Sequence, residues 1–330
     1  METGVNSVPV TPAVSRTRRI LVGFARTVIA VLTLYFVVES VSWKNVQSAF
    51  LSARLGPMAV GAVLLLLNLA ARTRKWQMMV DSLRSGTTFA ESARSLLLGI
   101  SFGSVTPAEI GELAGRTLHL PGARRSHVVG LTLLDRLQIM LVWVLFGVGA
   151  LAFLLMRPGP LQWLSVIAAL IFPSIVAWRL DLLGRLGHAV NDRWMQRGWI
   201  TRVLDGFSCL TPRVRARTLA LTVGFHLILC AQLYAFVNAF AVVSVIDAVL
   251  AASAVMFVKA MLPISLADLG VREMAAVYFF GLVGVPAAAA LNASLLLFVV
   301  NIVVPGTVGA LEWWLVRSRP NTTPDAERQR

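Results

Sequence analysis

The chain has 330 residues, of which 57% are hydrophobic and only 14% carry a charge. Soluble domains carry roughly 25% charged residues, so this composition excludes a water-soluble globular protein and predicts one embedded in lipid. The net charge is +14. Because the basic residues flank apolar segments, they indicate topology and contact with lipid headgroups; nucleic-acid binding would favour a separate basic domain, which the sequence lacks.

The N-terminal part of the chain predicts a cytoplasmic start and a first membrane span. Residues 1–17 are polar and are predicted to be disordered. Arginines precede the apolar run 20–38, which is long and lacks a small-residue cleavage site, so it is interpreted as an uncleaved span with its N-terminus in the cytoplasm. A second span is predicted over about 57–71, and the cations that end it are expected to be cytoplasmic: Arg72, Arg74 and Lys75.

The rest of the chain completes an all-α, polytopic membrane bundle of about six to eight spans, within one membrane domain at 18–316. Further spans are predicted at about 128–156, 161–178, 219–240, 248–262 and 287–315. The arginine-rich stretch 179–217 is either a cytoplasmic loop with interfacial amphipathic helices or a solvated topology determinant, and the latter is favoured. Residues 317–330 form a polar tail.

Two segments, 89–120 and 262–285, are apolar but broken by proline and glycine. Each is too short or too interrupted to cross as one helix, which predicts broken or re-entrant helices. Irregular backbone at membrane depth is tolerated where it lines a cavity or packs against protein. The two segments share a pattern, which indicates an internal repeat with a central site. The predicted helix-breaking residues are Pro107, Gly111, Pro263 and Gly270.

Charged residues also lie where hydrocarbon makes them costly, and such residues are functional candidates. The first group is Glu109, Glu112 and Arg116; the second is Asp135 and Arg136; the third is Lys259, Asp268, Arg272 and Glu273. A helix would bring Glu112 and Arg116 onto one face, and Thr106 with Glu109 fits a capping box. Asp135 and Arg136 point about 100° apart, so each is expected to find a separate partner. The alternatives are a capped interfacial helix for the first group and neutralisation near the interface for the second.

At these residues the chain resembles the membrane region of lysylphosphatidylglycerol synthases, a flippase-like family. The resemblance is carried by TPAEIGELAGR at 106–116, LDR at 134–136, LPISLADLGVRE at 262–273 and SLLLFVVNIVVPGTVGAL at 294–311. One departure is Ala267-Asp268, where family members more often carry glycine. The resemblance implies a polytopic fold with re-entrant helices and a role in moving an anionic or modified lipid across the bacterial inner membrane. The separate synthase domain of the family is expected to be absent.

The leading hypothesis is therefore a lipid translocase with membrane lipids as its partners. Arg116, Arg136, Arg272 and Lys259 are predicted to bind an anionic headgroup, since arginine suits bidentate phosphate recognition. Carboxylates would hold these cations or exchange protons: Glu109, Glu112, Asp135, Asp268 and Glu273. No phosphate-binding loop, cofactor motif or metal-ligand cluster is visible. The alternatives are a membrane-embedded transferase and a scaffold for a lipid-modifying enzyme, and the lipid itself stays open.

Overall fold

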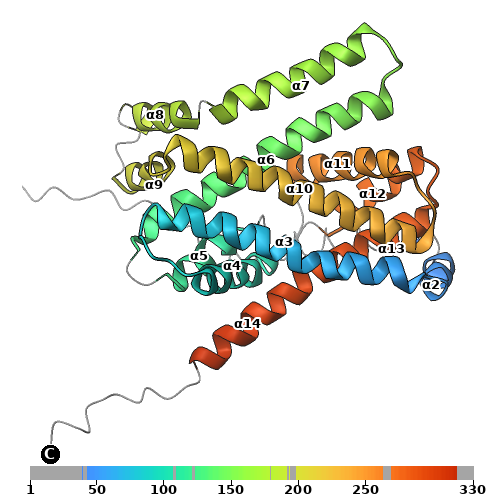
Figure 1. Ribbon diagram of the computed structural model, residues 1–330, viewed down its shortest axis with the longest axis horizontal. Helices are drawn as coiled ribbons and strands as arrows, with labels where there is room; N and C mark the ends of the chain where they lie inside the picture. The colour runs from blue at the N-terminus through green and yellow to red at the C-terminus, as the bar shows by residue number, and fades with distance from the viewer. Residues whose placement is uncertain are drawn as a thin grey trace, which may run out of the picture.

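The computed structural model describes residues 43–106, 109–120, 123–178, 180–191, 198–262 and 269–317, together with Glu39 and Arg193. Regular structure in these residues is helical (Figure 1). The helices are α2 (Trp43–Leu51), α3 (Leu55–Asp81), α4 (Phe89–Ser104), α5 (Gly111–Leu118), α6 (Arg125–Leu155), α7 (Pro160–Trp178), α8 (Leu180–Val190), α9 (Gly198–Ser208), α10 (Pro212–Phe240), α11 (Val245–Met261), α12 (Val271–Leu282), α13 (Ala287–Phe298), the π-helical turn η2 (Val299–Val303) and α14 (Val304–Arg317). The predicted disordered N-terminus, the first span at 20–38, the tail beyond residue 317, Pro107, Pro263 and Asp268 lie outside the described residues.

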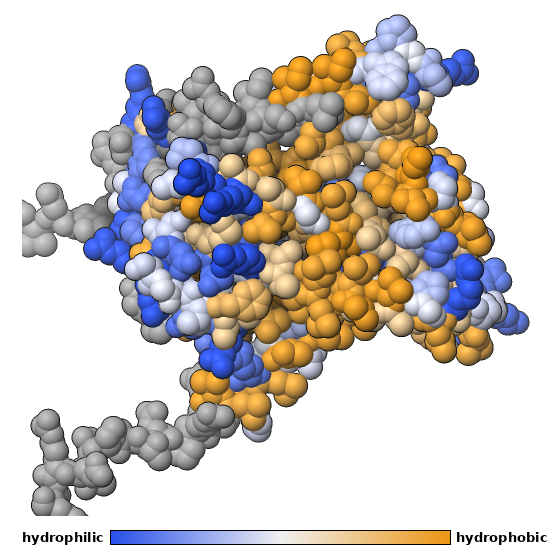
Figure 2. Space-filling view, in the orientation of Figure 1, coloured by the Kyte–Doolittle hydropathy of each residue, from blue (hydrophilic) through white to orange (hydrophobic). Residues whose placement is uncertain are grey.

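Four helical rods in the described part of the chain are long and apolar enough to cross a membrane: α3, α6, α10 and the continuous run Ala287–Val316 through α13, η2 and α14. Each coincides with a predicted span, and the all-α membrane fold is confirmed. On the face in view, an apolar band lies between two polar ends (Figure 2). The α3 helix continues to Asp81, ten residues beyond its predicted end at residue 71, and so includes Arg72 and Lys75 within a regular helix.

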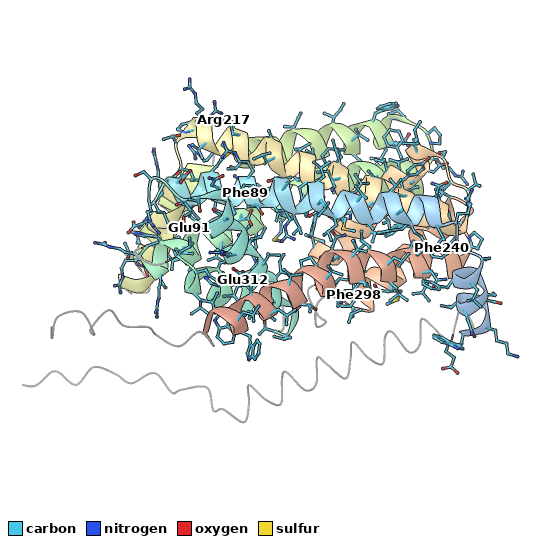
Figure 3. All side chains as sticks on the ribbon, turned by 60° about the horizontal axis from the view of Figure 1, so that its bottom comes forward. Phe89, Glu91, Arg217, Phe240, Phe298 and Glu312 are labelled. Atoms are coloured by element: carbon cyan, nitrogen blue, oxygen red, sulfur yellow. The ribbon has the colours of Figure 1, made fainter. Side chains whose placement is uncertain are left out.

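Between these rods lie two helical hairpins that occupy opposite halves of the bundle. The α4–α5 hairpin lies beside the C-terminal half of α3, and α11 and α12 lie near the opposite end (Figure 1). Figure 3 places Glu91, near the start of α4, and Arg217, near the start of α10, at one end, and Phe240 at the other. The segment 248–262, predicted as a span, is instead the first arm of the second hairpin, with 17 residues in α11.

The order of elements repeats with inverted direction. A rod, a hairpin and a rod follow one another as α3, α4–α5 and α6, and again as α10, α11–α12 and α13–α14. The first hairpin enters from the end where α3 finishes, and the second enters from the end where α10 finishes. The structure therefore gives the two broken segments the relation expected of an internal repeat.

Local sequence explains where the first hairpin begins and turns. Thr88 accepts a hydrogen bond from the Glu91 backbone N–H (3.2 Å), while the Glu91 carboxylate accepts from the Thr88 N–H (2.9 Å). These bonds form a capping box and hold the pKa of Glu91 below its usual range. At the turn, Glu109 has a φ of 53°, in the left-handed region. The Thr106 hydroxyl accepts from the Gly111 N–H at 2.7 Å and so caps α5.

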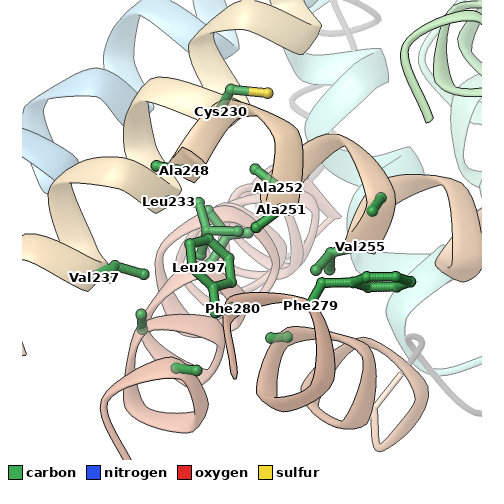
Figure 4. Close-up of a cluster of buried hydrophobic side chains, with 14 of the residues drawn as sticks. Cys230, Leu233, Val237, Ala248, Ala251, Ala252, Val255, Phe279, Phe280 and Leu297 are labelled. Atoms are coloured by element: carbon green, nitrogen blue, oxygen red, sulfur yellow. The ribbon is translucent and has the colours of Figure 1, made fainter. Parts of the chain in front are cut away.

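The second half of the bundle holds the largest apolar core. Leu233 and Val237 of α10 belong to one buried cluster with Ala251, Ala252 and Val255 of α11 (Figure 4). Phe279 and Phe280 of α12 and Leu297 of α13 complete this cluster. Small residues on α11 let the helix backbones approach closely, which is how helices associate in lipid.

The close approach of α4 and α5 depends on glycine. A Cβ atom at Gly111 would collide with the backbone carbonyl oxygen of Phe102, and one at Gly115 would collide with that of Leu98. We expect Gly111→Ala to lower the free energy of unfolding by about 1–3 kcal/mol, because backbone rather than a flexible side chain must move. Thermal unfolding in detergent measures this loss.

The control for this substitution is Gly149→Ala, in the last third of α6. A Cβ atom at Gly149 meets no atom within 4 Å, so this variant should be neutral or more stable by about 0.5–1 kcal/mol. Equal unfolding temperatures for the two variants would contradict the close-packing role of Gly111.

Candidate functional site

A cavity of about 350 Å³ lies within the bundle, between the inner ends of the two hairpins. The end of α4 and the Glu109 turn border it from one hairpin, and the end of α11 with the start of α12 borders it from the other. Its polar and charged lining is Asn68, Arg72, Ser104, Glu109, Glu112, Asp135, Arg136, Lys259, Arg272 and Asn301. The predicted broken segments therefore meet at one internal space.

On the side of the first hairpin, charged groups form a continuous network. Asp135 of α6 pairs through one oxygen with Lys75 Nζ (2.6 Å) and through the other with Arg116 Nη1 (2.9 Å). Arg116 also pairs with Glu112, four residues earlier on α5, at 2.5 Å. The predicted Glu112–Arg116 pair is confirmed. The network joins α3, α5 and α6 through side chains that are almost completely buried.

Arg116 is the most enclosed cation of this network, with 1% of its surface exposed. Its guanidinium carbon lies 4.4 Å from the centre of the Trp76 ring, a cation–π geometry. The Trp76 indole N–H donates to Ser95 (3.1 Å), whose hydroxyl donates to the Arg116 carbonyl (2.8 Å). Arg116 does not line the cavity. It lies behind the lining and fixes the positions of Glu112 and Asp135 through its ion pairs with them.

Arg136 lies at the cavity surface and pairs with both glutamates of the first hairpin. Its guanidinium donates twice to one Glu112 oxygen, at 3.0 and 2.6 Å, and reaches the Glu109 carboxylate at 3.2 Å and its carbonyl at 2.8 Å. Asp135 and Arg136 thus have separate partners, as predicted. The predicted capping box between Thr106 and Glu109 is wrong, because the Glu109 carboxylate turns to Arg136 instead.

On the side of the second hairpin, Arg272 and Glu273 form a compact pair at the start of α12. Glu273 accepts from Arg272 at 2.5 and 3.1 Å, from Ser294 at 3.2 Å and from the Gly270 N–H at 2.8 Å. Gly270 has a φ of 90°, a conformation that glycine adopts readily, and it is the residue before α12. Glu273 is fully buried, whereas Arg272 is 2% exposed and still borders the cavity.

Two further cations complete the lining. Lys259 of α11 lies with its ammonium 5.2 Å from the centre of the Trp143 ring. Arg72 of α3 lies with its guanidinium carbon 5.4 Å from the centre of the Phe225 ring. With the residues that the structure describes, Arg72 forms no ion pair. The charges around the first hairpin do not balance, because four cations lie near three carboxylates and leave an excess of positive charge. The four cations are Arg72, Lys75, Arg116 and Arg136.

The structure thus brings together most of the residues selected from the sequence. Arg136, Arg272, Lys259, Glu109, Glu112 and Asp135 line one cavity. Arg116 and Glu273 lie directly behind this lining as ion-pair partners. Gly111 is the first residue of α5, and Gly270 is the residue before α12.

Sequence reasoning missed Arg72, Lys75 and Asn68, because the first two were interpreted as a cytoplasmic flank. A signal was present: positions 68, 72 and 75 are four and three residues apart and so share one face of a helix. Three polar residues that share one face of a membrane-spanning helix indicate a buried polar partner, which here is Asp135 for Lys75 and Gln232 for Asn68.

The comparison with protein families decides what this arrangement belongs to. The family described as lysylphosphatidylglycerol synthase TM region matches residues 23–309. The chain belongs to this family. A search of curated proteins finds no match. Membership of the lysylphosphatidylglycerol synthase TM region family makes the chain a multi-pass membrane protein of lipid-related function.

The matched range of the family contains both hairpins and every charged residue of the cavity. Within the described residues, no three His, Cys, Asp or Glu side chains gather in a way that could hold a metal ion.

Proposed function

We propose that this protein moves an anionic phospholipid across the membrane, with the cavity receiving the phosphate of the headgroup. The observation that carries this proposal is the cavity itself. It lies inside a membrane bundle where two opposed hairpins meet, and its lining has an excess of cations. Transporters place substrate sites where discontinuous helices meet near the middle of the membrane.

The roles of the cations follow from their contacts. Arg72 presents a guanidinium that forms no ion pair with the described carboxylates, and arginine binds phosphate through two parallel hydrogen bonds. Lys259 and Arg272 lie across the cavity on the second hairpin. Arg116 and Arg136 hold Glu109, Glu112 and Asp135 in place, so that these carboxylates do not repel the ligand.

The basic residues also support an orientation for the proposed translocase. Arg74, Arg84, Arg124, Arg125 and Arg217 lie near the end where α3 finishes and where α6 and α10 begin. The positive-inside rule assigns that end to the cytoplasm. We therefore propose that the first hairpin enters from the cytoplasmic side of a bacterial inner membrane and the second from the opposite side, with the N-terminus cytoplasmic.

Reconstitution into phosphatidylcholine vesicles tests this function. Labelled phosphatidylglycerol should cross the bilayer at least ten times faster with the protein than without it, and faster than labelled phosphatidylcholine, which has no net charge. Accessibility of the label to a membrane-impermeant quencher measures the rate.

Other outcomes would favour the rival functions. Covalent change of the lipid when an activated sugar or aminoacyl donor is supplied would indicate a transferase. If the protein showed no transport and no turnover, this result would contradict the translocase and favour a scaffold for a lipid-modifying enzyme. Equal rates for both lipids would contradict recognition of the anionic headgroup.

A further inference from the structure

A second concave site, a groove of about 520 Å³, lies on the outside of the bundle between the end of α4, η2 and α14. Among the residues that the structure describes, those lining this groove carry no charge. Most are large and apolar, and the principal ones are Val105, Leu269, Phe298, Val303, Leu311 and Trp314. Its size is within the range of about 300–1,000 Å³ that is usual for ligand sites.

The three described hydroxyl groups that line the groove have no proton left to donate to a ligand. Ser101 donates to the Gly306 carbonyl, Ser104 donates to the Ser101 carbonyl (2.9 Å), and Thr307 donates to the Val303 carbonyl (2.8 Å). Each hydroxyl proton is therefore used within the protein. The groove presents an apolar surface despite its serine and threonine residues.

The groove adjoins the charged cavity. Ser104 and Ile302 line both spaces. Along the π-helical turn η2, Asn301 lines the cavity, Ile302 lines both spaces and Val303 lines the groove. Turns of π-helix inside longer helices are frequent at functional sites. Here the π-turn forms the partition between a charged compartment and an apolar one.

We propose that this groove holds an acyl chain of the same glycerophospholipid whose phosphate headgroup occupies the cavity. This inference rests on the proposed function, because the cavity supplies the anchor for the headgroup. A charged space and an apolar space that share a wall match an amphipathic ligand. A lipid bound in this way keeps its acyl chain in an apolar groove and its charged headgroup in a polar cavity. The headgroup therefore does not pay the cost of entering hydrocarbon without hydrogen-bonding partners.

The groove binds a chain more specifically than the rest of the lipid-facing surface. Val308 lies on the same helix and is 49% exposed, but it does not line the groove. Ala310 is also exposed and does line it. A tryptophan at Ala310 would therefore fill part of the groove, whereas a tryptophan at Val308 would change only the outer surface.

The experiment compares Ala310→Trp with Val308→Trp in the full chain. Each protein is purified in detergent with phosphatidylglycerol, washed, and examined by native mass spectrometry for retained lipid. We expect the wild type and Val308→Trp to retain the lipid, and Ala310→Trp to retain at least ten-fold less. Binding of glycerol phosphate, which has the headgroup charge and no chain, should be equal in all three. Equal unfolding temperatures show that both variants fold.

Two results would overturn the groove assignment: equal retention by the two tryptophan variants, or a parallel loss of glycerol phosphate binding in Ala310→Trp alone. The vesicle assay distinguishes failure of the groove assignment from failure of the proposed translocase function. If the wild type transports lipid but the two tryptophan variants retain equal amounts of it, the translocase function stands and the groove has no part in lipid binding. Lipid retention that depends on Ala310 in a protein without transport would support the groove and contradict translocation.

Discussion

Replacing Asp135 by asparagine is expected to lower the free energy of unfolding by about 3–5 kcal/mol, because it breaks a buried ionic network at its centre. Asp135 is the common partner of Lys75 and Arg116, and all three side chains are almost fully buried. Asparagine keeps the shape but removes the charge, so two cations would lose their shared counter-ion. Unfolding in mixed detergent micelles measures the loss.

Two comparisons make this result specific. Asp205→Asn changes an aspartate with 47% of its side chain exposed and a His188 contact of 3.5 Å, and it should alter stability by no more than about 0.5 kcal/mol. Adding Lys75→Met to Asp135→Asn removes one uncompensated cation, so the double variant should be more stable than Asp135→Asn alone. A Lys75→Met substitution that destabilises both backgrounds equally would contradict the coupling.

Replacing Arg72 by glutamine is expected to reduce transport of phosphatidylglycerol by roughly 10- to 150-fold, with little change in unfolding temperature. The estimate corresponds to a hydrogen bond to a charged group, about 1.5–3 kcal/mol. Arg72 lines the cavity, and its guanidinium lies over the face of the Phe225 ring. Because described carboxylates form no ion pair with Arg72, its removal should affect the ligand more than the fold. The vesicle assay gives the rate.

The matched control is Arg74→Gln, on the same helix. Arg74 is exposed, donates to Gln77 at 2.8 Å and does not line the cavity, so its loss should leave transport within two-fold, or roughly 0.4 kcal/mol. Arg72→Lys keeps the charge but lacks the planar fork of the guanidinium and should give an intermediate rate. Equal transport by the two glutamine variants would remove Arg72 from the site.

The sequence predicted the parts of the fold that depend on local hydropathy and helix interruption. Long apolar runs in lipid can only form helices that satisfy their own backbone, and α6, α10 and α13–α14 appear where such runs occur. The broken segments were recognised because glycine and charge interrupt them, and Gly270 indeed lies at a φ of 90°. The separate partners of Asp135 and Arg136 followed from the angle between helical neighbours.

The sequence could not predict pairings between helices that are distant along the chain. Lys75 and Asp135 are 60 residues apart, and nothing local distinguishes a lysine that ends a span from one that lies inside the bundle. The same limit applies to Glu109, whose choice of Arg136 over Thr106 depends on where α6 packs. The groove beside η2 was also hidden, since it depends on the contact of α14 with α4 at Ser101 and Gly306.

The order of synthesis along the chain places the cations Lys75 and Arg116 in the membrane region before Asp135, the carboxylate that they neutralise. Lys75 leaves the ribosome 60 residues before Asp135, about 3–12 s earlier at ordinary elongation rates. During this interval its long side chain can extend to the headgroup layer, because it lies in the last two turns of α3. Glu112 and Arg116 emerge almost together. When Asp135 enters the membrane, both of its counter-ions have already been synthesised, so this carboxylate need not be buried without a positive partner.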